Sequence, residues 1–304
     1  MNGGIVKNIQ KCYFIVQEND CYFARNGGHM KKDNNRLKKI VVTGVCIMGV
    51  SVTSTLRTSA SCIEKYSVKP NKQANVVTEW YGDVDESDEN KHEFKVTPEK
   101  KPDKWKKLNT HEEKINVCQI AKVELQKMST TELLSACLEY PMFGDMAFFD
   151  NDQEGFTEVK ENYNALGELL KRKDAGKIVY DRYRELNFDE LIELSEYPLL
   201  QLRYFETILV QKRILSTMSV EERADLLELS KKNIELKITK YEGKLDPIPS
   251  IWIIVRILNM DNSDFRKLVD ENKSLNYFEK YGTLENVTEK ELDEVIEYIN
   301  TIMG

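Results

Sequence analysis

The sequence predicts an all-α fold: a multi-helical domain of stacked helical hairpins, either repeat-like or an irregular bundle. The first observation is a set of capping boxes, in which a hydroxyl residue caps a helix and a glutamate three positions later reaches back to it. Four such boxes occur, at Thr110–Glu113, Ser129–Glu132, Ser219–Glu222 and Thr288–Glu291. The second observation is that apolar residues recur at helical spacing between these starts, whereas no long run alternates with the period of a strand.

The predicted helices follow one another from about residue 108. At three starts, an apolar residue before the cap and one in the first turn form a hydrophobic staple. These pairs are Met128 with Leu133, Leu186 with Leu191, whose cap is Asn187, and Val287 with Leu292. The β-branched run Ile251–Ile257 is also expected to be a helix, buried and capped by Ser250.

A short pattern occurs twice in the helical region. Leu134-x-x-Cys137-x-Glu139-Tyr140-Pro141 returns as Leu191-x-x-Leu194-x-Glu196-Tyr197-Pro198. Both copies follow a capped start, and in both the proline is expected to open the next helix at its first position. The echo favours a repeat-like stack, and chance recurrence of common helix signals is the alternative.

Residues 30–60 have the composition of a secretory signal peptide. Positive residues come first, an uncharged stretch runs from Ile40 to Val52, and small residues end at Ala60. This stretch is shorter than the roughly 20 residues that span a bilayer, so cleavage is expected. A retained membrane anchor over residues 40–56 is the alternative.

Two features flank this signal. Residues 1–29 do not belong ahead of a signal peptide, and Asn26-Gly27-Gly28-His29 reads as a translated ribosome-binding site before a start at Met30. These residues are therefore expected to be a misannotated start or a disordered extension. On the other side, Cys62 is a candidate for lipidation, although Ser59 stands where a lipobox has an aliphatic residue.

Charge limits the classes of partner. The whole chain has a net charge of -7, and removal of residues 1–60 leaves 35 of its 44 basic and 48 of its 51 acidic residues, a net charge of -13. Such a chain is expected to bind no nucleic acid, because phosphate neutralisation needs a basic face. It is expected to contact a membrane only through its N-terminal segment.

Residues 61–104 are predicted to be a disordered acidic tether, because they lack hydrophobic periodicity and carry blocks of charge. Residues 105–304 are predicted to form the helical domain. Between the two lies the lysine-rich stretch 99–107, which is interpreted as a solvated hinge. The alternative is that its five lysines and Trp105 contact a polyanionic surface.

The strongest chemical motif lies at residues 150–161, where the spacing of acidic residues around a glycine at the sixth position is that of an EF-hand calcium loop. A helix start without metal would look similar, because carboxylates favour helix N-termini. Calcium is the only cofactor that the sequence suggests. The candidate ligands are Asp150, Asp152, Glu154, Glu158 and Glu161.

Cys118 and Cys137 are the only cysteines of the predicted domain and lie on consecutive helical segments. Export permits a disulfide between them, and two buried thiols are the alternative. The chain has three histidines, and His111 is expected to be a surface or capping residue. Because no nucleophile–base, zinc or phosphate-loop motif is present, no catalytic residue is assigned.

Several stretches between residues 97 and 176 resemble a family of exported all-helical proteins of Gram-positive, clostridial-type bacteria, a family without an assigned activity. The resemblance covers about 80 residues and implies export and a helical fold, with no catalytic residue. The matching stretches are Thr97–Lys100, Trp105–Glu113, Met128–Leu134, Glu139–Pro141 and Glu168–Gly176.

These observations predict an exported, non-catalytic helical interaction module of unknown ligand, secreted or at the cell surface. Its expected partner is a protein or a component of the cell envelope. The alternatives are an extracellular hydrolase that uses carboxylates the sequence does not identify, and a calcium-binding helical protein that uses residues 150–161.

Overall fold

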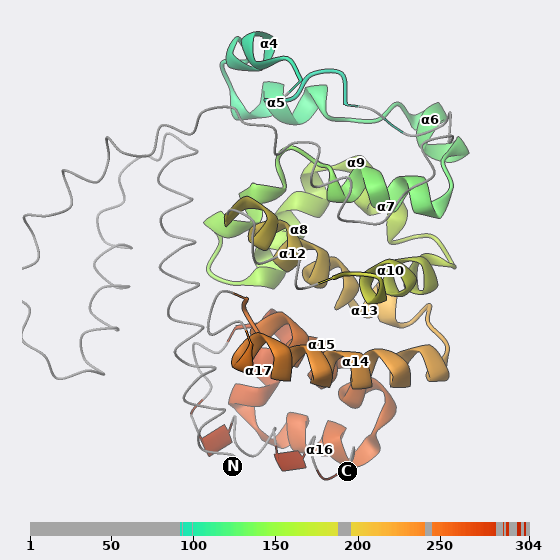
Figure 1. The fold of residues 1–304 in the computed structure, drawn as a ribbon, viewed down its shortest axis with the longest axis vertical. Helices are drawn as coiled ribbons and strands as arrows, with labels where there is room; N and C mark the ends of the chain where they lie inside the picture. Colours follow the sequence, from blue (N-terminus) through green and yellow to red (C-terminus); the bar gives the residue numbers. More distant parts are fainter. Residues whose placement is uncertain are drawn as a thin grey trace, which may run out of the picture.

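The computed structural model describes residues 92, 94–98, 100–187, 196–240 and 245–283, together with residues 288, 290, 291, 297, 298 and 301. This part of the chain contains thirteen α-helices, one 3-10 helix and no strand, so the predicted all-α fold is confirmed. The helices lie across the long axis of the molecule in successive layers, and the order of the layers broadly follows the sequence (Figure 1).

The first layer contains α4 (Pro102–Lys106), α5 (His111–Val117) and α6 (Lys122–Lys127). Proline opens α4, where its missing amide hydrogen removes no helical hydrogen bond. The predicted capping box of Thr110 and Glu113 opens α5. This layer forms one end of the stack (Figure 1).

The folded part begins earlier than the predicted boundary at residue 105. Phe94 is buried and belongs to the hydrophobic core. The ring of His92 meets that of Phe94 edge-on, and its Nδ1 lies 2.7 Å from Glu124 Oε1. Residues 94–98 and 100–104, which the sequence assigned to the tether, therefore belong to the helical domain.

The second layer is the largest, and its first helix begins at the predicted capping box of Ser129. Met128 and Leu133 of the predicted staple are both buried. The rings of Tyr140 and Tyr163 stack with centroids 4.0 Å apart, and such a pair contributes about 0.5–1.5 kcal/mol beyond its burial. The elements are α7 (Thr130–Leu138), η2 (Phe143–Phe148), α8 (Asp152–Asn162), α9 (Asn164–Leu169), α10 (Ala175–Arg184), α12 (Glu196–Leu209) and α13 (Lys212–Leu215).

The third layer contains α14 (Val220–Thr239), α15 (Ile248–Asp261), α16 (Ser263–Glu271) and α17 (Lys273–Tyr281). The predicted capping box of Ser219 begins α14. Every residue of α15 from Ile248 to Leu258 is buried, which confirms the buried helix predicted for Ile251–Ile257. Because its side chains are buried along this whole stretch, α15 is the central helix of this layer. Each fully buried isoleucine or leucine stabilises the fold by roughly 1.5–3 kcal/mol.

The predicted cap of α15 is wrong. The helix begins at Ile248, two residues before Ser250, and Pro247 occupies the N-cap position. The Oδ1 atom of Asp246 accepts a hydrogen bond from the Ile248 amide at 2.9 Å and satisfies the helix start. Ser250 instead lies inside the helix, where its hydroxyl contacts buried charged groups.

One of the remaining predicted helix starts is confirmed, and the others lie outside the described residues. The fourth capping box is present, because Thr288 and Glu291 exchange both of its hydrogen bonds. The helix start predicted after Asn187, and the staples that involve Leu191 and Leu292, depend on residues outside the described part of the chain.

The two prolines of the internal echo are not equivalent. Pro141 lies in the turn before the 3-10 helix η2, whereas Pro198 is the third residue of α12. Neither proline opens its helix at the first position. The predicted equivalence is therefore wrong, because a 3-10 segment follows the first copy of the pattern and an α-helix contains the end of the second.

Gly155 allows α8 to pack closely against η2. A Cβ atom at this position would lie 2.3 Å from the carbonyl oxygen of Met146. Any larger side chain would therefore force the two backbones apart. The glycine that the calcium interpretation assigned to a loop turn serves helix packing instead.

Candidate functional site

The best candidate for a functional site is a polar junction between α5 and η2. His111 Nε2 of α5 lies 3.0 Å from Asp145 Oδ2 of η2, and their side chains are 57% and 12% exposed. Lys114 and Cys118 follow His111 at spacings of three and seven residues, which places all three on one side of α5. The junction therefore gathers an imidazole, an amine, a thiol and a carboxyl group where the first layer meets the second.

The carboxyl group of Asp145 has a raised pKa. Burial raises its pKa from 3.8 to about 6, the charge and hydrogen bond of His111 oppose the shift, and the charge of Glu158 adds to it. Glu158 comes from α8, so two acidic side chains from different elements approach the same place. A buried carboxyl beside a second acid is a common feature of catalytic sites and also of structural ion pairs.

The thiol at this junction is poorly suited to nucleophilic chemistry. Burial and the nearby charge of Asp145 raise the pKa of Cys118 to about 12, and the thiolate is the reactive form of cysteine. Burial also raises the pKa of Cys137. Both cysteines are buried free thiols in this structure, and the disulfide between them stays a prediction.

The residues of the predicted calcium loop do not form a loop. From Asp152 onward they belong to α8, and the Asn151 side chain caps this helix by accepting a hydrogen bond from the Glu154 amide. In a helix, Glu154, Glu158 and Glu161 lie on one side and Asp152 on the other. The predicted loop geometry is therefore wrong, because the asparagine cap starts the helix within the motif.

Asp152 has a structural partner instead. Its Oδ1 lies 3.1 Å from Arg203 Nε and 2.9 Å from Nη2, and the Asp152 side chain is buried. In the part of the chain that the structure describes, no cluster of three or more His, Cys, Asp or Glu side chains is arranged to hold a metal ion. Calcium binding through these residues stays a prediction without an EF-hand geometry.

A second polar centre, which the sequence did not reveal, lies inside the stack. Glu206 Oε1 of α12 accepts hydrogen bonds from Tyr183 Oη at 2.6 Å, Lys237 Nζ at 2.6 Å and Ser250 Oγ at 3.1 Å. The side chains of Lys237 and Glu206 are 0% and 1% exposed. Asn233 donates to Tyr183 Oη at 3.1 Å. This buried cluster joins α10, α12, α14 and α15, two helices from each of the second and third layers.

A sequence signal for the buried cluster existed in α14. Its buried stripe begins with apolar residues at Leu226 and Leu227 and continues at helical spacing with Ser230, Asn233 and Lys237. Polar residues at core positions of an amphipathic helix need buried partners. The sequence does not say where those partners lie, because Glu206 comes from a different helix.

One more acid, Asp246, lies close to these charges. Burial raises its pKa to about 6, Arg203 and Lys237 oppose the shift, and Asp152 adds to it. Among the described residues of this group, Asp152, Glu206 and Asp246 are carboxyls and Arg203 and Lys237 are cations, so the carboxyls outnumber the cations. Asp246 is thus the surplus acid, and its Oδ2 is buried without a hydrogen-bond partner among the described residues.

We predict that Asp246→Asn stabilises the protein at pH 7.5 and has almost no effect near pH 4. The folded state holds the Asp246 proton more tightly than the unfolded state, so its contribution is complete below pH 3.8 and is lost as the pH rises through about 6. Asparagine keeps the oxygen that accepts from Ile248 and carries no charge. The expected gain is about 1–2 kcal/mol, which is less than the full shift implies because Asp246 is partly exposed. Urea denaturation at both pH values checks this, and an equal effect at both would contradict it.

No protein family, curated protein or solved structure matches this chain. The resemblance to exported clostridial-type proteins therefore stays a prediction. Residues 1–60, with the predicted signal, the alternative anchor at 40–56 and Cys62, lie outside the described part of the chain. Among the helices that the structure does describe, none combines the length and the apolar character needed to cross a bilayer.

Proposed function

We propose that this protein is an exported, non-catalytic helical interaction module that acts at the cell surface or outside the cell. The observation that carries the proposal is the use of its buried polar groups. Glu206 bonds to Lys237 and Ser250 across the boundary between the second and third layers, and Arg203 of α12 bonds to Asp152 of α8 within the second layer. In some proteins buried ionic groups select one arrangement of the fold, and a domain that presents its surface to a partner needs a defined arrangement.

The chemistry of the junction between α5 and η2 supports the non-catalytic part of the proposal. The raised pKa of the Cys118 thiol keeps it protonated at neutral pH. His111 is engaged by Asp145 and not by a nucleophile in any contact that the described residues make. The acidic composition and the predicted export segment support a partner in the envelope or in the medium.

One observation favours the hydrolase alternative. The pKa of Asp145 is raised by burial and by the nearby charge of Glu158, and a buried acid beside a second carboxyl is an arrangement that acid–base hydrolysis uses. Asp145→Asn separates the two functions. It removes the acid that a hydrolase would use, whereas an interaction module keeps its affinity for its partner.

The test uses the full chain with a C-terminal tag, expressed in a Gram-positive host. We expect the protein in the medium or the envelope fraction, with an N-terminus near residue 61 by mass spectrometry. We also expect saturable binding to one component of the envelope or medium, unchanged in Asp145→Asn. Retention of the uncleaved chain in the cytoplasm would contradict export. Release of a product from envelope polymers that is lost in Asp145→Asn would establish the hydrolase instead.

A further inference from the structure

The first layer and the rest of the stack differ in the sign of their net charge. Between residues 100 and 127, which include α4–α6, the chain has eight lysines and four acidic residues, a net charge of +4. Residues 128–304 have 22 basic and 35 acidic residues, a net charge of -13. The acidic protein therefore has one basic end, formed by the first layer, and the fold separates this end from most of the acidic residues.

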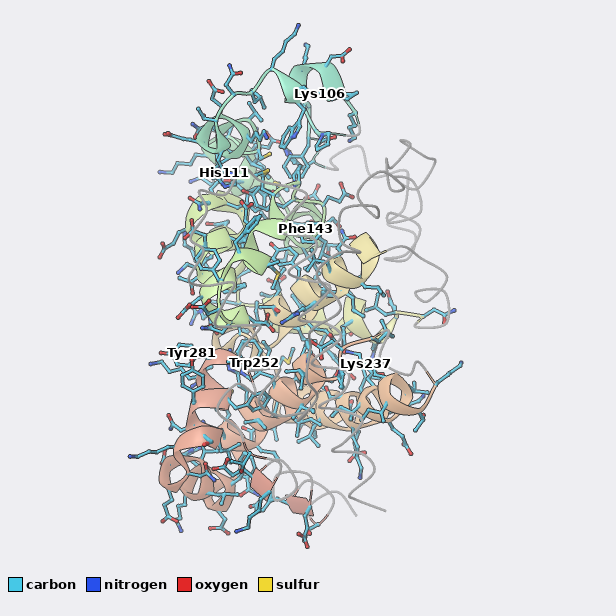
Figure 2. The ribbon with its side chains drawn as sticks, turned by 90° about the vertical axis from the view of Figure 1, so that its left-hand side faces the viewer. Lys106, His111, Phe143, Lys237, Trp252 and Tyr281 are labelled. Carbon is cyan, nitrogen blue, oxygen red and sulfur yellow. The ribbon has the colours of Figure 1, made fainter. Side chains whose placement is uncertain are left out.

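The lysines of the basic end are concentrated on and beside α4. This helix lies at one extreme of the long axis (Figure 1), and Lys106 marks that extreme in Figure 2, with His111, Phe143 and Trp252 following toward the other end. The stretch 100–107 contributes five exposed lysines: Lys100, Lys101, Lys104, Lys106 and Lys107. Lys122 and Lys127 of α6 are exposed as well.

Four of these lysines have no acidic partner among the residues that the structure describes. Lys101, Lys104, Lys106 and Lys107 form no ion pair with any described residue, although Asp103 lies on the same helix. By contrast, Lys177 of α10 pairs with Asp181 at 2.5 Å. The positive charges of α4 are therefore available to an external anion.

Trp105 anchors α4, the helix that carries two of these lysines and lies beside the other two. Its side chain is buried, and Lys114 Nζ of α5 lies 5.8 Å from the centre of its ring. The backbone amides of Lys104 and Trp105 bond to the Lys101 carbonyl oxygen at 3.0 and 2.9 Å. Trp105 is therefore not free to insert into a partner, and the basic end acts through charge alone.

The chemistry of the basic end suits a diffuse layer of phosphates. All its cations are lysines, and no arginine occurs between residues 94 and 127. Arginine provides the rigid fork that grips one carboxylate or phosphate, whereas lysine acts as a mobile point charge. Near an anionic bilayer each lysine increases affinity by about fivefold. Acidic groups more than a Debye length from the surface, about 8–10 Å, are largely screened, so those deeper in the stack oppose contact only weakly.

We propose that the basic end docks on an anionic phospholipid bilayer, which replaces the sequence-based expectation that only the N-terminal segment contacts a membrane. Charge complementarity supports this partner, because the exposed lysines on and beside α4 meet the phosphates of an anionic bilayer at one end of the stack. A bilayer also offers a flat sheet of phosphates, which four mobile lysine charges without a described ion-pair partner can meet together at one end of the stack. The proposal rests on the proposed interaction function and names its partner.

The experiment measures binding of the full chain to vesicles of phosphatidylcholine, with and without 30% phosphatidylglycerol, by co-sedimentation. The test variant carries Lys101→Glu, Lys104→Glu, Lys106→Glu and Lys107→Glu. The matched control carries the same charge change at four exposed lysines far from α4: Lys232→Glu, Lys267→Glu, Lys273→Glu and Lys280→Glu. We expect wild type and control to prefer the anionic vesicles by at least about tenfold at low salt, and the test variant to lose this preference.

Equal preference for anionic vesicles in the two variants would overturn the proposal, because the N-terminal segment or net charge would then explain the binding. Tighter binding to soluble polyphosphate or RNA than to vesicles would also overturn it. Circular dichroism must show the same helix content in both variants, which excludes unfolding as the cause. Neither result affects the proposed function itself, which fails only if the chain is not exported or binds no external component.

Discussion

Replacing Lys237 with methionine is expected to lower the free energy of unfolding by about 3–5 kcal/mol. Lys237 Nζ donates to Glu206 Oε1 at 2.6 Å and to Ser250 Oγ at 3.0 Å, and the side chain is fully buried. Methionine has a similar length and fills the same space, so the loss does not come from a cavity. It comes from the uncompensated charge of Glu206, which stays buried without its cation.

A second substitution shows that the unpaired charge is the cause. In Lys237→Met combined with Glu206→Gln, no buried charge is left alone, and glutamine keeps an oxygen that accepts from Tyr183 and Ser250. We expect the double variant to recover at least half of the lost stability. Lys232→Met, at an exposed position of the same helix, is the control and should change stability by less than about 0.5 kcal/mol.

Urea denaturation monitored by circular dichroism at pH 7.5 measures these effects. A loss in Lys237→Met no larger than that in Lys232→Met would contradict the structural role of the buried cluster. A double variant less stable than Lys237→Met would mean that the carboxylate of Glu206 is needed for its hydrogen bonds and not only for its charge.

The helix starts could be predicted because their signals are local. Ser129 and Glu132, or Ser219 and Glu222, satisfy each other within four residues, and the structure contains both boxes. The start of α15 was predicted three residues late. Ser250 looks like a cap in the sequence, but its hydroxyl contacts Lys237 and Glu206 in the folded protein, and only the tertiary structure brings these groups together.

The candidate site was less predictable for the same reason. The acidic spacing of residues 150–161 satisfies a ligand pattern, but a pattern does not specify the backbone conformation. Asn151 caps α8 within the motif, and Arg203 binds Asp152 from a distant helix. The pairing of His111 with Asp145 could not be predicted either, because no sequence pattern near one residue indicates the other as its partner.

Arg256 holds the C-terminal part of the stack together through contacts with three other helices or their ends. Its guanidinium donates to the carbonyl oxygens of Glu279 and Lys280 at the end of α17, at 3.0 Å each, and to that of Val210 after α12, at 3.1 Å. It also donates to Gln153 Oε1 of α8 at 2.8 Å, across 103 residues of sequence. Three of these four acceptors are carbonyl oxygens at helix C-termini, where a positive charge is favourable.

The charge of Arg256 survives its burial. Burial lowers its pKa to about 10, and the charge of Glu279 opposes the shift, so the guanidinium is protonated at neutral pH. Its central carbon lies 4.2 Å from the ring centre of Trp252, which adds a cation–π contact. The indole nitrogen of Trp252 donates to the same Glu279 carbonyl oxygen at 2.7 Å. The two side chains therefore fasten the end of α17 jointly.

We expect Arg256→Met to cost about 3–5 kcal/mol, since the carbonyl oxygens of Val210 and Lys280 and the Oε1 atom of Gln153 lose the donor that Arg256 provides. Arg256→Lys should recover little, because one ammonium cannot replace a planar fork that reaches four acceptors. Arg266→Met is the control: this exposed arginine also bonds to helix-end carbonyls, at Asn259 and Met260, and its loss should cost less than about 1 kcal/mol.

Hydrogen exchange distinguishes local opening of α17 from a general loss of stability. If Arg256 fastens α17, the amides of residues 273–281 should lose protection in Arg256→Met before those of α7, which it does not contact. Uniform loss of protection across all helices would instead show that the whole stack unfolds as one unit. Full recovery of stability in Arg256→Lys would show that charge alone, and not the fork geometry, holds α17 in place.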